Sequence, residues 1–307
     1  MLSLHDLVKV YPGSVTALQG VTLSIPPGMF GLLGPNGAGK STLMRILAGL
    51  LEPTSGRVEL DGVDVTERPE LVRERLGYLP QDFGFYAHLS GLAMLEHLLA
   101  LKGVDGPRGR RALARELLER VNLGSAAERK VKGYSGGMRQ RLGIAQAIAG
   151  DPRLVIVDEP TAGLDPEERV RFYHVLAELA QERIVVLSTH IVEDVAVLCP
   201  RFAVIKGGRV LRVTTPTEAR GRIEGAMFEG FVERGELEAL SRTQCVTQSM
   251  LVEGRTRARV FDPKGQPPPG FALARATLED FYLALVRGAL QVPEAATDAA
   301  LVGSGAR

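Results

Sequence analysis

A glycine-rich stretch, GPNGAGKS at residues 34–41, has the residue types and spacing needed to bind phosphate. It fits the pattern G-x-x-x-x-G-K-[ST], in which glycines let backbone N–H groups curl around a phosphate and the N-terminus of the next helix adds positive charge. Lys40 can neutralise phosphate, and the Ser41 hydroxyl can reach Mg²⁺. An ordinary glycine-rich turn is the alternative. The apolar run at 29–34 and the helical pattern after the turn favour phosphate binding.

An acidic pair, Asp158 and Glu159, stands at the end of the apolar run LVIVD at 154–158. Adjacent side chains at the end of a strand point to opposite sides. Asp158 can therefore hold Mg²⁺ through water while Glu159 polarises an attacking water. A helix-capping role is the alternative for such a pair taken alone. A phosphate-binding Lys40 in the same chain favours the metal and water roles.

The overall composition limits the classes of protein that can carry these motifs. The chain has 307 residues, 45% of them hydrophobic and 24% charged, which fits one large domain or one domain plus a smaller one. Its net charge of +1 provides no global field that would recruit nucleic acid or anionic lipid. Two distant cysteines, Cys199 and Cys245, exclude a disulfide framework and suit a reducing cytoplasm. Without a signal peptide or a run of about 18 apolar residues, we expect no membrane span.

Alternating apolar runs and helical patterns predict an α/β domain over residues 1–213. The runs at 29–34, 154–158 and 184–189 are continuously apolar, as expected of parallel strands buried on both faces. Strand-like segments with a hairpin at Asp61-Gly62 come early in the chain and predict an antiparallel β layer.

Three further regions differ from this core in composition and hydrophobic pattern. Helical periodicity dominates residues 82–150 and predicts a helical subdomain. Residues 214–288 combine short alternating stretches with a final helical pattern, which predicts a small α+β accessory region. Residues 289–307 are small and polar, and we expect them to be disordered.

Taken together, the motifs resemble those of the ATP-binding subunit of ABC transporters. GPNGAGKS resembles that family's Walker A and LVIVDEP its Walker B. YSGGM at 134–138 resembles its signature, AGLD at 162–165 its D-loop, Gln81 its Q-loop and His190 its switch histidine. The six motifs follow the family's order and cover about residues 2–213. The resemblance implies a P-loop NTPase fold, the ABC cassette, with a mostly parallel core sheet.

The resemblance also implies an ATPase site that uses ATP and Mg²⁺. The ATP contacts are expected from Tyr11, Gly34, Pro35, Asn36, Gly37, Ala38, Gly39, Lys40, Ser41 and Thr42. Lys40, Glu159 and His190 are the expected catalytic residues, with Asp165 in the D-loop, and Ser41, Gln81 and Asp158 are the expected Mg²⁺ ligands. The alternatives are a strand-end tyrosine for Tyr11, a plain loop amide for Gln81 and a packing role for His190.

In this family two cassettes pack head to tail, so that the signature of one chain faces the nucleotide held by the other. Ser135, Gly136 and Gly137 would then offer N–H groups and a positive helix end to the γ-phosphate. Tyr134 stands where leucine is commoner and Met138 where glutamine is commoner, but the SGG turn itself is unchanged. We expect ATP to join two copies of the chain, or the chain and a close relative.

The resemblance further implies a separate transmembrane permease and a location on the cytoplasmic face of the membrane. Residues 82–103 correspond to the family's helical region that receives the permease, although their apolar side chains could equally be core. Ser90-Gly91 replaces the usual threonine-valine there. The segment 277–285, TLEDFYLAL, resembles one near the end of exporter-type subunits and favours export. The transported substrate is not visible in the sequence.

Other classes of function fit the sequence less well. A chromosome-maintenance ATPase would carry a long coiled coil between the P-loop and the signature, and a tandem-cassette translation factor would need a second P-loop. A non-transport ABC-type ATPase, or a nucleotide-dependent regulatory or scaffold protein, is the main alternative. A non-catalytic regulator would be expected to lack Glu159 or His190, and both are present.

Overall fold

A computed structural model of the chain describes residues 1–161, 164–233 and 235–290. The chain divides into two units: Met1–His190 with Gly207–Arg209, and Ile191–Lys206 with the chain from Val210 onward. Residues 162–163 of the expected D-loop, and 291–307 of the expected disordered tail, lie outside the described residues. The predicted domain boundary at residue 213 stays a prediction.

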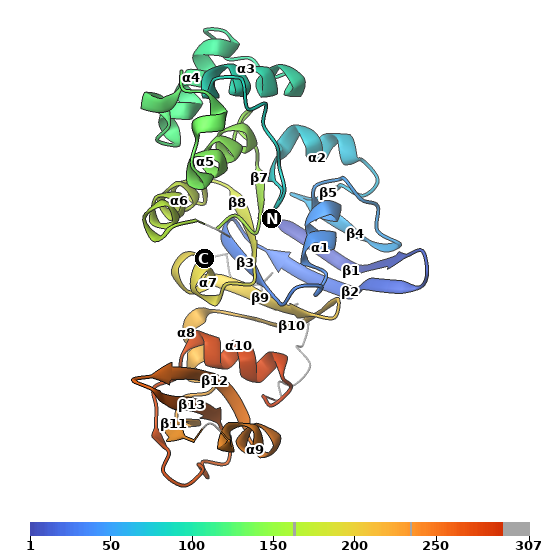
Figure 1. The fold of residues 1–307 in the computed structure, drawn as a ribbon. Helices are drawn as coiled ribbons and strands as arrows, with labels where there is room; N and C mark the ends of the chain where they lie inside the picture. Colours follow the sequence, from blue (N-terminus) through green and yellow to red (C-terminus); the bar gives the residue numbers. More distant parts are fainter. Residues whose placement is uncertain (162–163, 234, 291–307) are drawn as a thin grey trace, which may run out of the picture. The chain divides into compact units, whose positions relative to one another are not determined.

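The core of the first unit is a set of parallel strands flanked by an antiparallel sheet (Figure 1). The parallel strands follow the order β3 (Gly28–Leu33), β8 (Ile184–Thr189), β7 (Leu154–Asp158) and β6 (Leu76–Leu79). All side chains of β7 and β8 are buried, as expected of central strands covered on both faces. The predicted mostly parallel core is therefore confirmed.

The antiparallel layer precedes this core in the sequence. Its strand order is β2 (Val15–Ile25), β1 (Leu2–Tyr11), β4 (Ser55–Leu60) and β5 (Val63–Asp64). Glu59 pairs with Asp64 and Leu60 with Val63, so the chain makes the predicted hairpin at Asp61-Gly62. Asp61 and Gly62 both have positive φ, 50° and 83°, as a tight two-residue turn requires.

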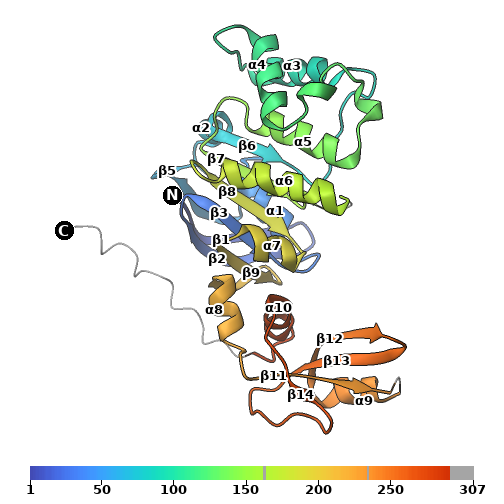
Figure 2. The same cartoon turned by 90° about the vertical axis from the view of Figure 1, so that its left-hand side faces the viewer.

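Helices complete the first unit. They are α1 (Lys40–Leu47), α2 (Pro69–Arg75), α3 (Gly91–Lys102), α4 (Arg110–Arg120), α5 (Gly136–Ala147) and α6 (Pro166–Leu179). Figures 1 and 2 both show α3 and α4 beside each other and away from β1 and β2, as expected of a helical subdomain. Helix α3 begins where Ser90 accepts a hydrogen bond from the Ala93 N–H and ends at Gly103, which has a φ of 68°.

The second unit contains the predicted small α+β region. Its sheet has the order β12 (Cys245–Val252), β13 (Arg255–Phe261), β11 (Met227–Val232) and β14 (Ala272–Leu273), paired antiparallel. Its helices are α7 (Val192–Leu198), α8 (Pro216–Gly221), α9 (Glu236–Thr243) and α10 (Leu278–Val286), and it also holds β9 (Arg201–Lys206) and β10 (Arg209–Thr214). Helix α10 packs against α7, which explains why this unit begins before residue 213.

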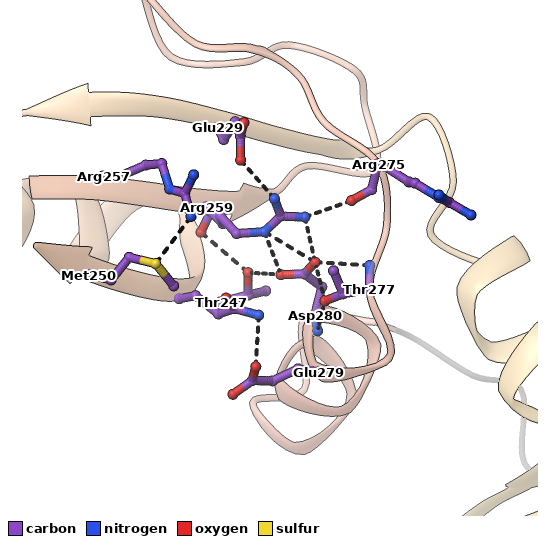
Figure 3. A network of polar contacts seen from close by, with 10 residues as sticks. Glu229, Thr247, Met250, Arg257, Arg259, Arg275, Thr277, Glu279 and Asp280 are labelled. Carbon is purple, nitrogen blue, oxygen red and sulfur yellow. Dashed lines mark hydrogen bonds and ion pairs between the residues drawn. The ribbon is translucent and has the colours of Figure 1, made fainter. Parts of the chain in front are cut away.

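A buried polar network fixes α10 to the sheet of the second unit (Figure 3). Arg259 on β13 donates from Nη2 to Asp280 Oδ2 at 2.7 Å and from Nη1 to Glu229 Oε2 at 2.8 Å. Burial opposes ionisation of the fully buried Asp280, but hydrogen bonds from Arg259, Thr247 and Thr277 outweigh burial and lower its pKa. Loss of either partner alone would leave the other charge buried without its counter-charge, which is strongly destabilising.

Candidate functional site

The predicted site residues gather at the carboxyl ends of three neighbouring parallel strands. Gly34 follows β3, Asp158 ends β7 and His190 follows β8. Strand register aligns these ends, with Leu33 beside Thr189 and Asp158 beside Ser188. Ligand sites in α/β folds form at this edge of the sheet, where loops and helix N-termini meet.

The glycine-rich turn 34–41 has the backbone conformation that its sequence predicts. Gly37 and Gly39 have φ values of 76° and 102°, a left-handed region that other residues rarely adopt. A Cβ atom at Gly39 would lie 2.5 Å from the carbonyl oxygen of Ala17, so this position also lacks room for a side chain. Helix α1 begins directly afterwards, at Lys40. The turn therefore presents a helix N-terminus next to a backbone loop, as a phosphate-binding turn does.

Lys40 is almost fully buried and points back into the turn. Its Nζ donates to the Gly34 carbonyl at 2.7 Å and lies 3.2 Å from Glu159 Oε1. Both side chains of this ion pair are 5% exposed. A buried ammonium group needs such partners, and a bound phosphate would offer Lys40 oxygen atoms of the same kind.

Glu159 is held in an unusual backbone conformation between two cationic or polar partners. Its φ is 51°, which costs a non-glycine residue about 1–3 kcal/mol. Its N–H donates to the Ser188 carbonyl at 2.9 Å. One carboxylate oxygen faces Lys40, and the other lies 2.5 Å from Nδ1 of His190, whose side chain is 46% exposed. Glu159 thus joins the phosphate-binding turn to the expected switch histidine.

Asp158 has a buried carboxylate oxygen that no described protein group satisfies. Its Oδ1 has no hydrogen-bond partner among the described residues, and neither has the nearby Ser188 hydroxyl. Burial raises the pKa of Asp158, and the neighbouring Ser41 hydroxyl opposes this rise. An unsatisfied carboxylate oxygen beside the Ser41 hydroxyl fits Mg²⁺, which prefers oxygen ligands. The described residues hold no group of three or more histidines, cysteines or acids that could hold a metal ion.

Two of the predicted site residues, one ATP contact and one metal ligand, have weaker links to this centre. The Tyr11 hydroxyl lies 3.4 Å from Thr42 Oγ1, which places the Tyr11 side chain near the start of α1. Gln81 follows β6 with an exposed side chain, and no described contact joins it to Asp158 or Ser41. Stacking by Tyr11 and metal binding by Gln81 both stay predictions.

The signature turn forms a second helix N-terminus. Ser135 caps α5 by accepting a hydrogen bond from the Met138 N–H at 3.1 Å, and Ser135 and Gly136 are exposed. A Cβ atom at Gly137 would lie 2.2 Å from Glu168 Oε2, so the close approach of α6 requires glycine there. No described hydrogen bond or ion pair joins residues 135–137 to residues 34–42 of the same chain.

An ion pair that the sequence did not reveal ties the signature helix to the helix after the D-loop. Arg141 on α5 and Glu168 on α6 are 2.5 Å apart, with side chains 5% and 12% exposed. Asp165 caps α6 by accepting a hydrogen bond from the Glu168 N–H at 2.8 Å. The signature turn and Asp165 are therefore attached to two helices that a buried ion pair holds together. No local pattern in the sequence indicates this pairing across 27 positions.

Several known proteins are similar to this chain in sequence or in fold. The sequence profile of the ABC transporter family matches residues 18–162. The daunorubicin resistance ATP-binding protein DrrA3 of Streptomyces coeruleorubidus is 35% identical over 92% of this chain and 95% of its own length. The daunorubicin/doxorubicin resistance ATP-binding protein DrrA of Streptomyces peucetius is 41% identical over 71% of this chain and 66% of its own length.

Some relatives are much longer than the matched region. The ABC transporter A family member 7 of Arabidopsis thaliana is 37% identical over 72% of this chain, which spans only 24% of that relative. Among solved structures, the dimeric post-hydrolysis state of the ATP-binding cassette MJ0796 bound to ADP and Pi is 30% identical, with a TM-score of 0.63. It covers 70% of this chain and 98% of its own length.

The fold and the site define an ATP-binding cassette, a P-loop ATPase of the ABC type. The chain belongs to the ABC transporter family, as one of its ATP-binding proteins. Among the described residues, no helix has both the length and the apolar character needed to cross a membrane.

Proposed function

We propose that the chain hydrolyses ATP with Mg²⁺ at the carboxyl ends of β3, β7 and β8, and that this cycle drives a membrane transporter. The proposal rests on one observation: Lys40 and His190 both contact the buried carboxylate of Glu159. Bound Mg²⁺ would supply charge neutralisation across the β- and γ-phosphates. Asp158 and Ser41 would hold the ion, with Gln81 as a further ligand.

Each side chain has a separate task in the proposed site. When ATP binds, the Lys40 ammonium group leaves the Gly34 carbonyl and the Glu159 carboxylate and donates hydrogen bonds to phosphate oxygens instead. Glu159, whose carboxylate lies 3.2 Å from the Lys40 ammonium group, orients and deprotonates the attacking water. His190 donates a hydrogen bond to the γ-phosphate and senses its presence. The turn 34–41 supplies backbone N–H groups, and Tyr11 stacks on the adenine.

We further propose that two copies bind ATP between them. The exposed N-terminus of α5 presents N–H groups that the helix itself cannot satisfy, and no described hydrogen bond or ion pair joins it to the phosphate turn of its own chain; both observations support a role toward a second chain. Dimeric cassettes among the similar structures support the same arrangement. Asp165, held close to α5 through Glu168, would lie at the same dimer interface.

Drug export through a separate permease on the cytoplasmic face of the membrane is the proposed biological task. The names of the Streptomyces relatives support resistance-type export for this chain. Residues 82–103 present the exposed Tyr86, which is 57% exposed, as one contact for the permease.

Replacing Glu159 with glutamine tests the proposed chemistry. Glu159→Gln should keep ATP binding and lose turnover by about 10²–10⁴, the usual contribution of a positioned base. Glu178→Gln, an exposed acid on α6, is the matched control and should keep full turnover. ATP binding is measured by titration and hydrolysis by phosphate release. Turnover near the wild-type rate in Glu159→Gln would remove this residue from its role, and a nucleotide-dependent regulator would then fit better.

A further inference from the structure

Two unusual residues of this chain contact each other next to the signature turn. Tyr134 occupies the place where leucine is commoner, and Gly91 is the first residue of α3. A Cβ atom built on Gly91 would lie 1.9 Å from the Tyr134 hydroxyl oxygen and 2.9 Å from its Cζ atom. Real atoms cannot approach so closely, so the tyrosine ring needs a glycine at position 91. The departures from the family pattern at positions 91 and 134 therefore depend on each other, because the tyrosine ring fits only where residue 91 has no side chain.

The Tyr134 side chain is fixed at both ends. It is 4% exposed, and its hydroxyl donates to the Ala126 carbonyl at 2.8 Å. Its backbone carbonyl accepts a hydrogen bond from Nη1 of Arg139 on α5 at 3.1 Å. Ser135 follows directly in the sequence and caps α5. Any shift of the Tyr134 ring is passed to Ser135 through a single peptide unit.

A short backbone ladder joins the start of α3 to the segment that leads into Tyr134. The N–H of Gly91 donates to the Arg129 carbonyl at 3.1 Å, and that of Leu92 donates to Ala127 at 2.8 Å. In the other direction, the N–H of Val131 donates to the Leu89 carbonyl at 2.9 Å. Hydrogen bonds running both ways make residues 87–92 and 126–132 one rigid piece, on which the tyrosine ring is seated.

We propose that Tyr134 is a positioning residue, which sets the signature Ser135 by seating its hydroxyl over Gly91 and against the Ala126 carbonyl. The inference rests on the proposed function, because Ser135 matters there as a contact to the nucleotide of a second chain. Through Gly91, the start of α3 and the signature turn form one unit, so a displacement of residues 87–92 displaces Ser135. A tyrosine that merely filled space would affect stability but not the contact across the dimer.

A set of variants in a Glu159→Gln chain separates these two roles. Gly91→Ala should raise the ATP concentration needed for dimer formation at least tenfold, because its Cβ displaces the ring. Tyr134→Phe should raise it about two- to tenfold, the range of one lost hydrogen bond. In a Tyr134→Leu chain, which has no ring to displace, adding Gly91→Ala should change this ATP concentration less than about threefold. Gly221→Ala, where a Cβ meets open space, is the matched control and should leave it unchanged.

Three readouts decide among the outcomes: ATP affinity of the dilute chain, ATP-dependent dimer formation by sedimentation, and a thermal melt. The inference predicts an unchanged affinity and weaker dimer formation well below the melting temperature. Equal dimer formation in Gly91→Ala and Gly221→Ala overturns it, as does a lower melting temperature alone. If Gly91→Ala does not fold, dimer formation by Tyr134→Phe, and by Tyr134→Leu with and without Gly91→Ala, tests the inference instead. Absence of ATP-dependent dimers in the Glu159→Gln chain with Tyr134 intact would count against the proposed function instead.

Discussion

Adding one methyl group at Gly137 should break the connection between the signature helix and the helix after the D-loop. The new Cβ would lie 2.2 Å from Glu168 Oε2, 2.7 Å from its Cδ and 2.8 Å from its Cβ. Three atoms of one side chain are too close, so rotation of the carboxylate alone cannot relieve the overlap. Glu168 must move away from α5, and with it the partner of the buried Arg141.

The loss of stability in Gly137→Ala can be worked out from the buried Arg141 side chain that loses its partner. An Arg141 that loses its carboxylate stays buried and uncompensated, which costs about 3–5 kcal/mol. Alanine recovers up to about 1 kcal/mol over glycine through its helix propensity. Glu168 loses little itself, because it keeps the more exposed Arg171 at 3.1 Å. We expect Gly137→Ala to lower the free energy of unfolding by about 2–4 kcal/mol, or about 5–15 °C in Tm for a unit of this size.

Thermal and denaturant unfolding of Gly137→Ala and Gly221→Ala measure this difference, because the second variant adds the same methyl group in open space. A Glu168→Ala chain provides the second comparison. It lacks the carboxylate and keeps only the Cβ atom, 2.8 Å from the added one, so Gly137→Ala should destabilise it by at least about 1 kcal/mol less than it destabilises the wild-type chain. The reasoning is refuted if Gly137→Ala is as stable as Gly221→Ala. It also fails if Gly137→Ala destabilises the wild-type and Glu168→Ala chains equally.

Two further predictions concern the dimer and the second unit. A Ser135→Arg chain and a Lys40→Ala chain should each be inactive alone. Mixing them should restore part of the ATPase activity, because one of the two sites of the heterodimer carries neither change. If labelled subunits exchange but no activity returns, the arrangement is contradicted. Because the pKa of Asp280 is lowered in the folded chain, its contribution to stability is present above the unfolded value of about 3.9 and is lost as pH falls through the lower folded value. The stability difference between wild type and Asp280→Asn should therefore shrink between about pH 5 and pH 2, and a constant difference in melts across that range would refute the assignment.

The sequence alone determined the phosphate-binding turn and the strands that support it. Eight consecutive residues, 34–41, contain the glycines with positive φ, the lysine and the serine, so their chemistry is local and readable in order. Strands β7 and β8 were equally predictable, because a strand buried on both faces has to be apolar throughout. The start of the second unit at Ile191, just before α7, was not predictable, since it depends on the packing of α7 against α10, far along the chain.

Only the tertiary structure decided how the separate motifs meet. The contact of Glu159 with both Lys40 and His190 arises because parallel pairing brings three strand ends to one edge. The Arg141–Glu168 pair, and the fit of the Tyr134 ring over Gly91, join residues that are far apart in the sequence and carry no shared local pattern. Backbone propensity and hydrophobic periodicity act over a few residues, whereas steric fit and buried charge pairing depend on which surfaces folding brings together.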